Sequence, residues 1–167
     1  MYDELTAQDI KKMEEELEDR IHNQRPVLLA EVVRCREFGD LSENFEYKEA
    51  KRAKNRNESR IRYLKRMIST ATVISDDSDE SSVGLYDRVT IYMADEDEEE
   101  TVQVVTTVRV NPLEGMISRE SPMGKAILGK HEGDKVTIKV SDDFSYEAEI
   151  RKIEKCDDDG SAPLLQY

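Results

Sequence analysis

The sequence is poor in the residues that build disulfides, zinc sites or membrane spans. Its two cysteines, Cys35 and Cys156, are isolated and form no Cys-x-x-Cys pair, so neither a disulfide nor a structural zinc site is expected. No apolar run approaches the roughly 20 residues of a membrane-spanning helix. The polar start MYDELTAQDI does not resemble a signal peptide. We therefore expect a cytoplasmic protein that does not contact a membrane.

Apolar residues are also scarce. They make up 37% of the chain and charged residues 38%, a balance that favours an elongated helical part beside a small globular part over one round core. The net charge is −13, and because residues 1–74 sum to zero, the whole excess lies in residues 75–167. Such an acidic chain is repelled by nucleic acid overall. Any contact with nucleic acid must therefore be local.

Two long segments carry apolar residues at helical spacing. Residues 6–37 and residues 43–74 each repeat apolar positions at steps of three, four or seven. Each segment has a single apolar stripe and must bury it against a partner, and the short link between them makes the two helices antiparallel neighbours. Residues 1–74 are therefore predicted to form a long antiparallel α-helical coiled-coil hairpin, with an acidic tip at residues 39–43.

Local signals place breaks within this hairpin. Thr6 followed by Asp9 suits the start of the first helix. Pro26 lies inside the first helical segment and lacks an N–H group, which predicts a kink or a loosened turn near Asn23. Gly39 suits the left-handed position that closes a helix.

The acidic residues of the link are open to two interpretations. Asp40 or Ser42 suits the N-cap of the second helix, and if Asp40 is the cap, Glu43 completes a capping box. The alternative is that the two carboxylates share a hard cation such as Mg²⁺, for which they are too few without ligands from a partner. Spacing alone favours the capping role.

Basic residues are in excess behind the tip. If the hairpin folds about Leu41, the acidic run 14–19 faces the bases of residues 60–66, so those charges are expected to pair between helices. Lys48, Arg52 and Arg56 share one stripe at a spacing of four and face few acids. This stripe suits a phosphate backbone, or it is a solvated face with partners such as Glu49.

The rest of the chain predicts a second domain. Residues 75–83 are polar and acidic and are interpreted as a linker, and residues 156–167 as a mobile acidic tail. The region between them, residues 84–155, is predicted to be an α+β domain with an antiparallel sheet. The expected strands cover 89–93, 101–108, 135–140 and 146–153, the short helix covers 122–128 with Ser121 as its N-cap, and the acidic hairpin loop covers 95–100.

Two stretches resemble a known family. Residues 36–47, REFGDLSENFEY, are similar to the G-D-L-[SK]-E-N-x-E-Y tip motif of the GreA/GreB family of bacterial transcript cleavage factors. Residues 117–130, ISRESPMGKAILGK, resemble a second segment of that family, and Arg25-Pro26 resembles the Arg-Pro of its first helix. The resemblance covers about residues 5–155 and is closer to the GreA-like branch, although Phe45 stands where the family often has Ala.

The resemblance implies a transcription elongation factor that is not an enzyme itself. The coiled coil would enter the secondary channel of bacterial RNA polymerase, and the C-terminal domain, FKBP-like in fold, would dock at its rim. The chain would have no cofactor of its own. Asp40 and Glu43 would help to hold Mg²⁺ jointly with the polymerase, whose cleavage of backtracked RNA they would stimulate. A monomer is expected, with the polymerase and the 3′ end of the nascent RNA as partners.

The same resemblance assigns further roles residue by residue. The expected tip-support residues are Gly39, Ser42, Asn44 and Tyr47. The expected RNA-facing bases are Lys48, Arg52 and Arg56, and the expected polymerase contacts are Glu120, Ser121 and Pro122. Two alternatives stay open: a channel-binding regulator that inhibits the polymerase without cleavage, and a coiled-coil adaptor or holdase that uses the apolar residues Phe38, Leu41 and Phe45.

Overall fold

A computed structural model describes residues 3–39 and 44–166 of the chain. The tip residues Asp40, Leu41, Ser42 and Glu43 lie outside the described residues. The chain divides into two compact units. The helical unit comprises Ile10–Ala71, and the sheet unit comprises Glu4–Asp9 together with Thr72–Gln166. The chain is thus a mixed α+β protein with a helical hairpin and a β-sheet domain.

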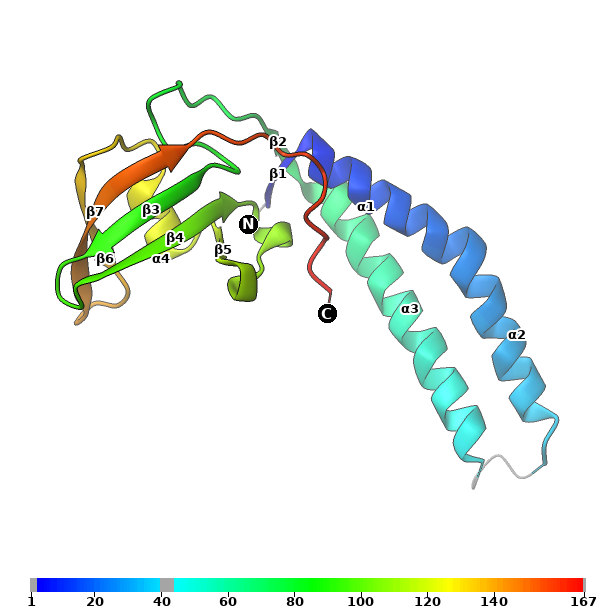
Figure 1. Cartoon of the computed structure of the whole chain (residues 1–167). Coiled ribbons are helices and arrows are strands. Elements are labelled where there is room, and N and C mark those ends of the chain that lie inside the picture. The colour runs from blue at the N-terminus through cyan, green and yellow to red at the C-terminus, as the bar shows by residue number, and fades with distance from the viewer. Residues whose placement is uncertain (1–2, 40–43, 167) are drawn as a thin grey trace. The chain divides into compact units, whose positions relative to one another are not determined.

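The hairpin has two arms, and the first arm is interrupted. It consists of α1 (Ala7–Asp19), a π-helical turn (Arg20–Gln24) and α2 (Arg25–Arg36). The second arm is the single helix α3 (Phe45–Thr70), which lies beside α2 (Figure 1). The loosened turn predicted near Asn23 is confirmed, since proline cannot donate the hydrogen bond of a regular helix and the π turn directly precedes α2.

The arms are held together by apolar packing and by ion pairs. Val32, Cys35 and Ala50 form a buried cluster against which Tyr47 packs. Arg60 donates two hydrogen bonds to Glu16, at 2.9 and 3.0 Å, which confirms the predicted pairing of the acidic run with the bases opposite. Arg25 and Glu58 make a second bidentate pair, at 2.7 and 2.9 Å.

The second arm is shorter than predicted at both ends. α3 starts at Phe45 rather than residue 43, and it ends at Thr70, because Ala71 is extended with φ −63° and ψ 140°. The prediction of helix through residue 74 is wrong. Residues Thr72–Ile74 form β2, which pairs in parallel with β1 (Glu4–Thr6). All three residues of β2 are β-branched and favour a strand over a helix.

The sheet unit contains a five-stranded sheet in the order β5-β4-β3-β7-β6 (Figure 1). Most predicted strands are confirmed, but the prediction of a wholly antiparallel sheet is wrong because β4 and β5 run parallel. The prediction of strand over 106–108 is also wrong, since Thr107–Arg109 form a 3-10 turn. The strands are β3 (Arg88–Met93), β4 (Glu98–Val105), β5 (Met116–Ser118), β6 (Lys135–Lys139) and β7 (Ser145–Glu154).

One face of this sheet carries the apolar core. Helix α4 (Pro122–Ile127) buries Ile127 against strand residues such as Val89, Ile91 and Ile150. The predicted start of α4 is confirmed, because the Ser121 hydroxyl accepts a hydrogen bond from the Gly124 N–H at 3.0 Å. The helix ends at Ile127, one residue earlier than predicted, with Leu128 as its C-cap, and Gly129 has a φ of +76°.

A buried ion pair joins the first residues of the chain to the sheet unit. Thr6 and Asp9 cap each other's backbone N–H groups, as the sequence predicted. Asp9 also accepts a hydrogen bond at 2.7 Å from Arg109, and both side chains are completely buried. The Tyr86 hydroxyl donates to the same carboxylate at 3.3 Å, and burial raises the pKa of Tyr86. These contacts tie residues 4–9 to the sheet unit.

The tail makes specific contacts, in contrast to the mobile tail expected from its composition. Arg109 donates hydrogen bonds to the Ala162 carbonyl at 2.6 Å and to Asp158 at 3.2 Å. The Leu165 N–H donates to the Val108 carbonyl, and Leu164 is buried. The acidic composition therefore did not prevent the tail from packing on the sheet unit.

Candidate functional site

The candidate site is the closed end of the hairpin, of which the structure describes both flanks. On the α2 side, Glu37 ends the helix, and the Phe38 N–H donates back to the Cys35 carbonyl. Gly39 has a φ of +102°, the left-handed conformation predicted for it. A side chain at this position would be strained, so Gly39 permits the chain to leave α2 in this direction.

Asn44 connects the two arms at this end. Its side-chain oxygen accepts a hydrogen bond from the Tyr47 N–H at 3.0 Å and so caps α3. Its side-chain nitrogen donates to the Cys35 carbonyl in the last turn of α2 at 2.9 Å. One amide therefore satisfies exposed backbone groups of both helices. This corrects the prediction that Asp40 or Ser42 is the N-cap.

The correction changes the interpretation of the acidic pair. The capping box predicted for Asp40 and Glu43 required α3 to begin near residue 41, whereas α3 begins at Phe45 with Asn44 as its cap. The capping explanation for these two carboxylates therefore loses its support. Asp40, Ser42 and Glu43 themselves lie outside the described residues, and the roles assigned to them stay predictions.

Tyr47, a predicted tip-support residue, packs near the start of α3. Its ring packs against the Val32–Cys35–Ala50 cluster, and the Arg36 guanidinium lies 5.7 Å from its centroid. Arg36 also donates to the Tyr47 hydroxyl at 3.5 Å, which with the positive charge lowers the pKa of Tyr47. Phe38 and Phe45, by contrast, are 64% and 70% exposed. The tip flanks thus combine a packed tyrosine with two exposed aromatic side chains, and the Arg34 guanidinium lies 5.4 Å from the ring centroid of Phe38.

The basic stripe behind the tip lies on the solvent side of α3. Lys48, Arg52 and Arg56 are all exposed. Arg52 pairs with Glu49 within the helix, as the alternative of a solvated face predicted, whereas Lys48 and Arg56 form no ion pair with another described residue. A shallow groove continues the stripe along α3, lined by Arg52, Asn55, Arg56, Ser59, Arg60 and Tyr63. Lys48 and Arg56 therefore present positive charge that no ion pair with another described residue neutralises.

The predicted polymerase-contact segment lies on the sheet unit, just before α4. Glu120 and Pro122 are exposed, and Glu120 pairs with Lys125 at 3.1 Å. Ser121 donates from its hydroxyl to the Ser118 carbonyl at 2.7 Å while it caps α4. Ser121 therefore fixes the backbone that presents its two neighbours to solvent.

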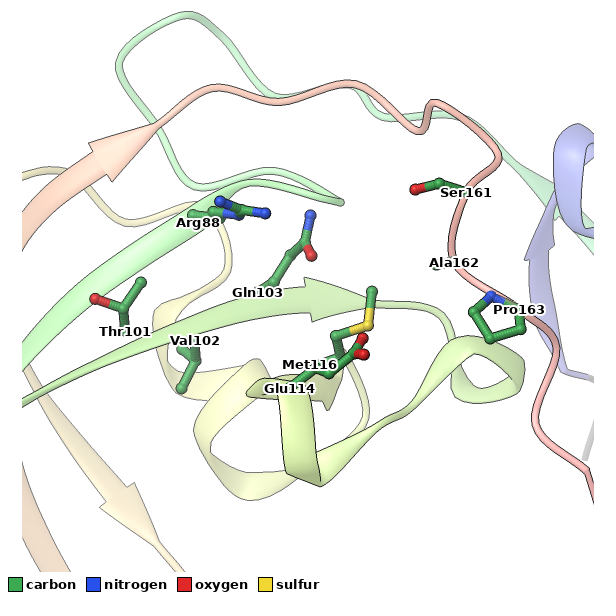
Figure 2. Close-up of a pocket in the computed structure, with 9 residues that line it drawn as sticks. All are labelled: Arg88, Thr101, Val102, Gln103, Glu114, Met116, Ser161, Ala162 and Pro163. Carbon is green, nitrogen blue, oxygen red and sulfur yellow. The ribbon is translucent and has the colours of Figure 1, made fainter.

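A hollow that the sequence did not suggest lies in the sheet unit (Figure 2). The tail passes over one side of it, and β3, β4 and β5 contribute the other. Its lining residues are Arg88, Thr101, Val102, Gln103, Glu114, Met116, Ser161, Ala162 and Pro163. Gln103 is already engaged, since its amide donates to the Tyr86 carbonyl at 2.6 Å. The lining offers no nucleophile beside a base, and we assign it no chemistry.

The described part of the chain offers neither a ready metal site nor a membrane-spanning helix. Within residues 3–39 and 44–166, no three His, Cys, Asp or Glu side chains are grouped so that they could hold a metal ion. No helix in this part of the chain is long and apolar enough to cross a membrane.

Comparison with known proteins connects this geometry to a family. The N-terminal model of the GreA/GreB transcription elongation factors matches residues 4–73, and the C-terminal model matches residues 77–155. Two relatives are each named transcription elongation factor GreA. The protein of Oenococcus oeni is 38% identical and the alignment covers 90% of this chain and 94% of that protein. The protein of Leuconostoc mesenteroides is 40% identical, with coverage of 90% and 95%.

Solved structures give a related match. The crystal structure of GreA factor homolog 1 of Thermus thermophilus is 27% identical, and the match covers 93% of this chain and 100% of that chain with a TM-score of 0.43.

Proposed function

The chain belongs to the GreA/GreB family of transcription elongation factors, and we propose that it stimulates RNA polymerase to cleave backtracked RNA. In this proposal the chain is not an enzyme of its own. The hairpin acts as a coiled coil that enters the secondary channel of the polymerase and carries the acidic tip to the active centre. The observation that supports this most is the pair of hydrogen bonds that Asn44 makes to α2 and α3, called here the Asn44 clamp. Because Asn44 is the N-cap of α3, the prediction that Asp40 and Glu43 serve as caps of this helix loses its support.

The carboxylates of Asp40 and Glu43 are the kind of oxygen ligand that a magnesium ion requires. Mg²⁺ prefers oxygen ligands and binds through one or two carboxylates together with groups from its substrate. Asp40 and Glu43 supply such oxygens and would hold the ion jointly with the polymerase. When bound, the ion would supply a nucleophilic water and stabilise the charge that develops at the phosphate. The described flanks fit this role, because Gly39 and Asn44 fix where the tip segment leaves α2 and enters α3.

The basic stripe supports the approach of an acidic tip to RNA. The chain as a whole is acidic and is repelled by nucleic acid. Lys48 and Arg56, unpaired among the described residues, together with Arg52 place positive charge on α3 behind the tip. We propose that these three residues face the phosphate backbone of the nascent RNA near its 3′ end. They would position the RNA without reading its sequence.

The segment Glu120-Ser121-Pro122 is proposed to contact the rim of the channel. Glu120 and Pro122 are exposed, and the Ser121 cap holds their backbone in place. Docking of the sheet unit at the rim would leave the hairpin free to enter the channel.

The test is to stall purified bacterial RNA polymerase in a backtracked complex and add the full-length chain with Mg²⁺. Shortened RNA and resumed elongation are the expected results. Uncut RNA with slowed elongation would identify a channel-binding inhibitor instead. A chain that neither binds polymerase nor changes its products would return the protein to the class of coiled-coil adaptors.

A further inference from the structure

The core face of the sheet is only partly covered. Helix α4 has six residues, so it is roughly 9 Å long at 1.5 Å per residue. Five strands span roughly 19 Å at about 4.8 Å apart. α4 contacts β6 and β5. At the end of the sheet where β6 turns into β7, apolar residues continue beyond the part that α4 covers.

Those residues form what is called here the β6–β7 patch, consisting of Val140, Phe144 and Tyr146. Tyr146 pairs with Ile138 across the two strands, so it lies on the same face as this fully buried core residue. Its ring lies 6.1 Å from that of Phe144. Val140 and Phe144 are 51% and 58% exposed. The patch is thus an extension of the core face into solvent.

The turn that presents this patch is well fixed. The Val140 and Ser141 N–H groups both donate to the Phe144 carbonyl, at 3.0 and 3.1 Å. The Phe144 N–H in turn donates to the Ser141 hydroxyl at 3.1 Å. Exposed apolar side chains on a fixed turn lose little conformational freedom when a partner covers them, which favours binding.

Carboxylates line one side of the patch. Glu98 and Glu100 pair with Met93 and Ile91 on β3, and because Ile91 is buried in the core, both glutamates project from the core face. Glu100 and Glu96 lie near enough to Tyr146 to contribute, after burial, to the raised pKa of its hydroxyl. These three glutamates form no ion pair with another described residue. The apolar patch therefore has an uncompensated acidic rim.

We propose that the β6–β7 patch and its rim of Glu96, Glu98 and Glu100 form a second docking surface for RNA polymerase. The surface would receive a polymerase segment that carries an apolar side chain flanked by lysine or arginine. Apolar burial would supply affinity, and the charges would supply orientation and a faster association. The inference rests on the function proposed above, and it adds a contact separate from Glu120-Ser121-Pro122.

The apolar part is tested with full-length Val140→Ser/Phe144→Ser. Both side chains are exposed, so thermal melting should match that of the wild type. The dissociation constant for RNA polymerase is expected to rise about tenfold, as for the loss of one well-packed contact. The matched control is Leu113→Ser, which removes a 98% exposed leucine elsewhere on the sheet unit and should change affinity less than about twofold. If the double variant has a lower melting temperature than the wild type, the dissociation constant is measured for Phe144→Ser alone.

The charge is tested with Glu100→Lys against Glu80→Lys, an exposed glutamate of the linker. Glu100→Lys should weaken binding about fivefold at low salt and less at high salt, whereas Glu80→Lys should not. Wild-type affinity in Val140→Ser/Phe144→Ser would overturn the inference. It would also be overturned if the patch variants abolish a self-association seen by sedimentation but bind polymerase normally. A wild-type chain that fails to bind polymerase would overturn the proposed function itself.

Discussion

At the scale of single residues, Asn44 joins the two helices that flank the tip. Its amide uses both of its hydrogen-bonding groups, one for the Tyr47 N–H and one for the Cys35 carbonyl. An ionised aspartate could replace the acceptor but has no donor for the Cys35 carbonyl, and serine has only one oxygen atom for both contacts. The link between the two flanks of the tip therefore depends on an amide at residue 44.

Replacing Asn44 with Ala should lower the free energy of unfolding by about 1 kcal/mol, the usual loss for an N-cap. It should also reduce stimulated RNA cleavage about tenfold, because the proposed Mg²⁺ ligands Asp40 and Glu43 would no longer be positioned for the reaction. Polymerase affinity should stay within about twofold, because the residues proposed to dock on the polymerase lie on the sheet unit. Asn44→Asp keeps the cap and loses only the bond to Cys35, so its cleavage should be intermediate. Full cleavage by Asn44→Ala would show that the clamp does not position the tip.

The buried ion pair of Asp9 and Arg109 makes a prediction about stability. Arg109→Met leaves two carboxylates, Asp9 and Asp158, without their arginine in a buried setting. The free energy of unfolding should fall by about 3–5 kcal/mol in urea titrations. Arg119→Met removes the partly exposed pair with Glu4 and should cost less than about 1 kcal/mol. An equal fall in the free energy of unfolding of the two variants would contradict the claim that the buried pair contributes more to stability than the partly exposed pair.

At the scale of elements, the ion pair between α1 and α3 makes the hairpin sensitive to acid. Partial burial raises the pKa of Glu16, but hydrogen bonds and charge from Arg60 and Arg20 outweigh it, so the pKa lies below the ordinary value of 4.5. The unfolded chain titrates near the ordinary value. Glu16 therefore contributes stability above about pH 4.5, and this contribution is lost as the pH falls through the lower folded pKa.

The predicted loss of stability at low pH is checked by measuring the free energy of unfolding in urea at pH 7 and at pH 3. The wild type should lose more stability between the two values than Glu16→Gln, which has no charge to lose. Glu14→Gln, an exposed change on the same helix, should keep the wild-type difference. A wild-type loss no larger than that of Glu16→Gln would contradict the role of the Glu16–Arg60 pair.

The elements that the sequence predicted are those with strong local signals. The helix spacing, the Pro26 interruption and the Ser121 cap of α4 all depend on residues close together in the chain. The strands β1, β2 and β5 were missed because each has three residues, too few to show alternation. Their pairing comes from distant partners, which spacing does not reveal.

The same distinction holds for the candidate site. Gly39 was predicted in the left-handed region from its place in the link, and it has that conformation. The N-cap was assigned wrongly because Asp, Ser and Asn are all good caps, and the choice of Asn44 depends on a bond to Cys35 nine residues earlier. The Asp9–Arg109 pair spans 100 residues, so spacing along the chain could not reveal it. The sequence predicted only the local role of Asp9, its cap with Thr6.

At the scale of the whole molecule, positive and negative charge lie in different parts of the chain. The hairpin region balances its charges overall but places a basic stripe behind the tip, and residues 75–167 carry the whole excess of −13. Within the described part of the chain, Arg52 pairs with Glu49, whereas Lys48 and Arg56 form no ion pair. A basic stripe suits RNA, and an acidic sheet unit suits a basic surface on a protein partner. This division supports the proposal that Asp40 and Glu43 complete a site that belongs to RNA polymerase.

The most direct test of that claim compares the wild type with Asp40→Asn/Glu43→Gln on backtracked RNA polymerase complexes. The variant keeps the size and polarity of both side chains and removes both charges. It is expected to bind polymerase with wild-type affinity, measured in the same reactions, and to lose at least about 100-fold of the stimulated cleavage rate. Wild-type cleavage by the variant would contradict the assignment of Asp40 and Glu43 as the working groups of this protein.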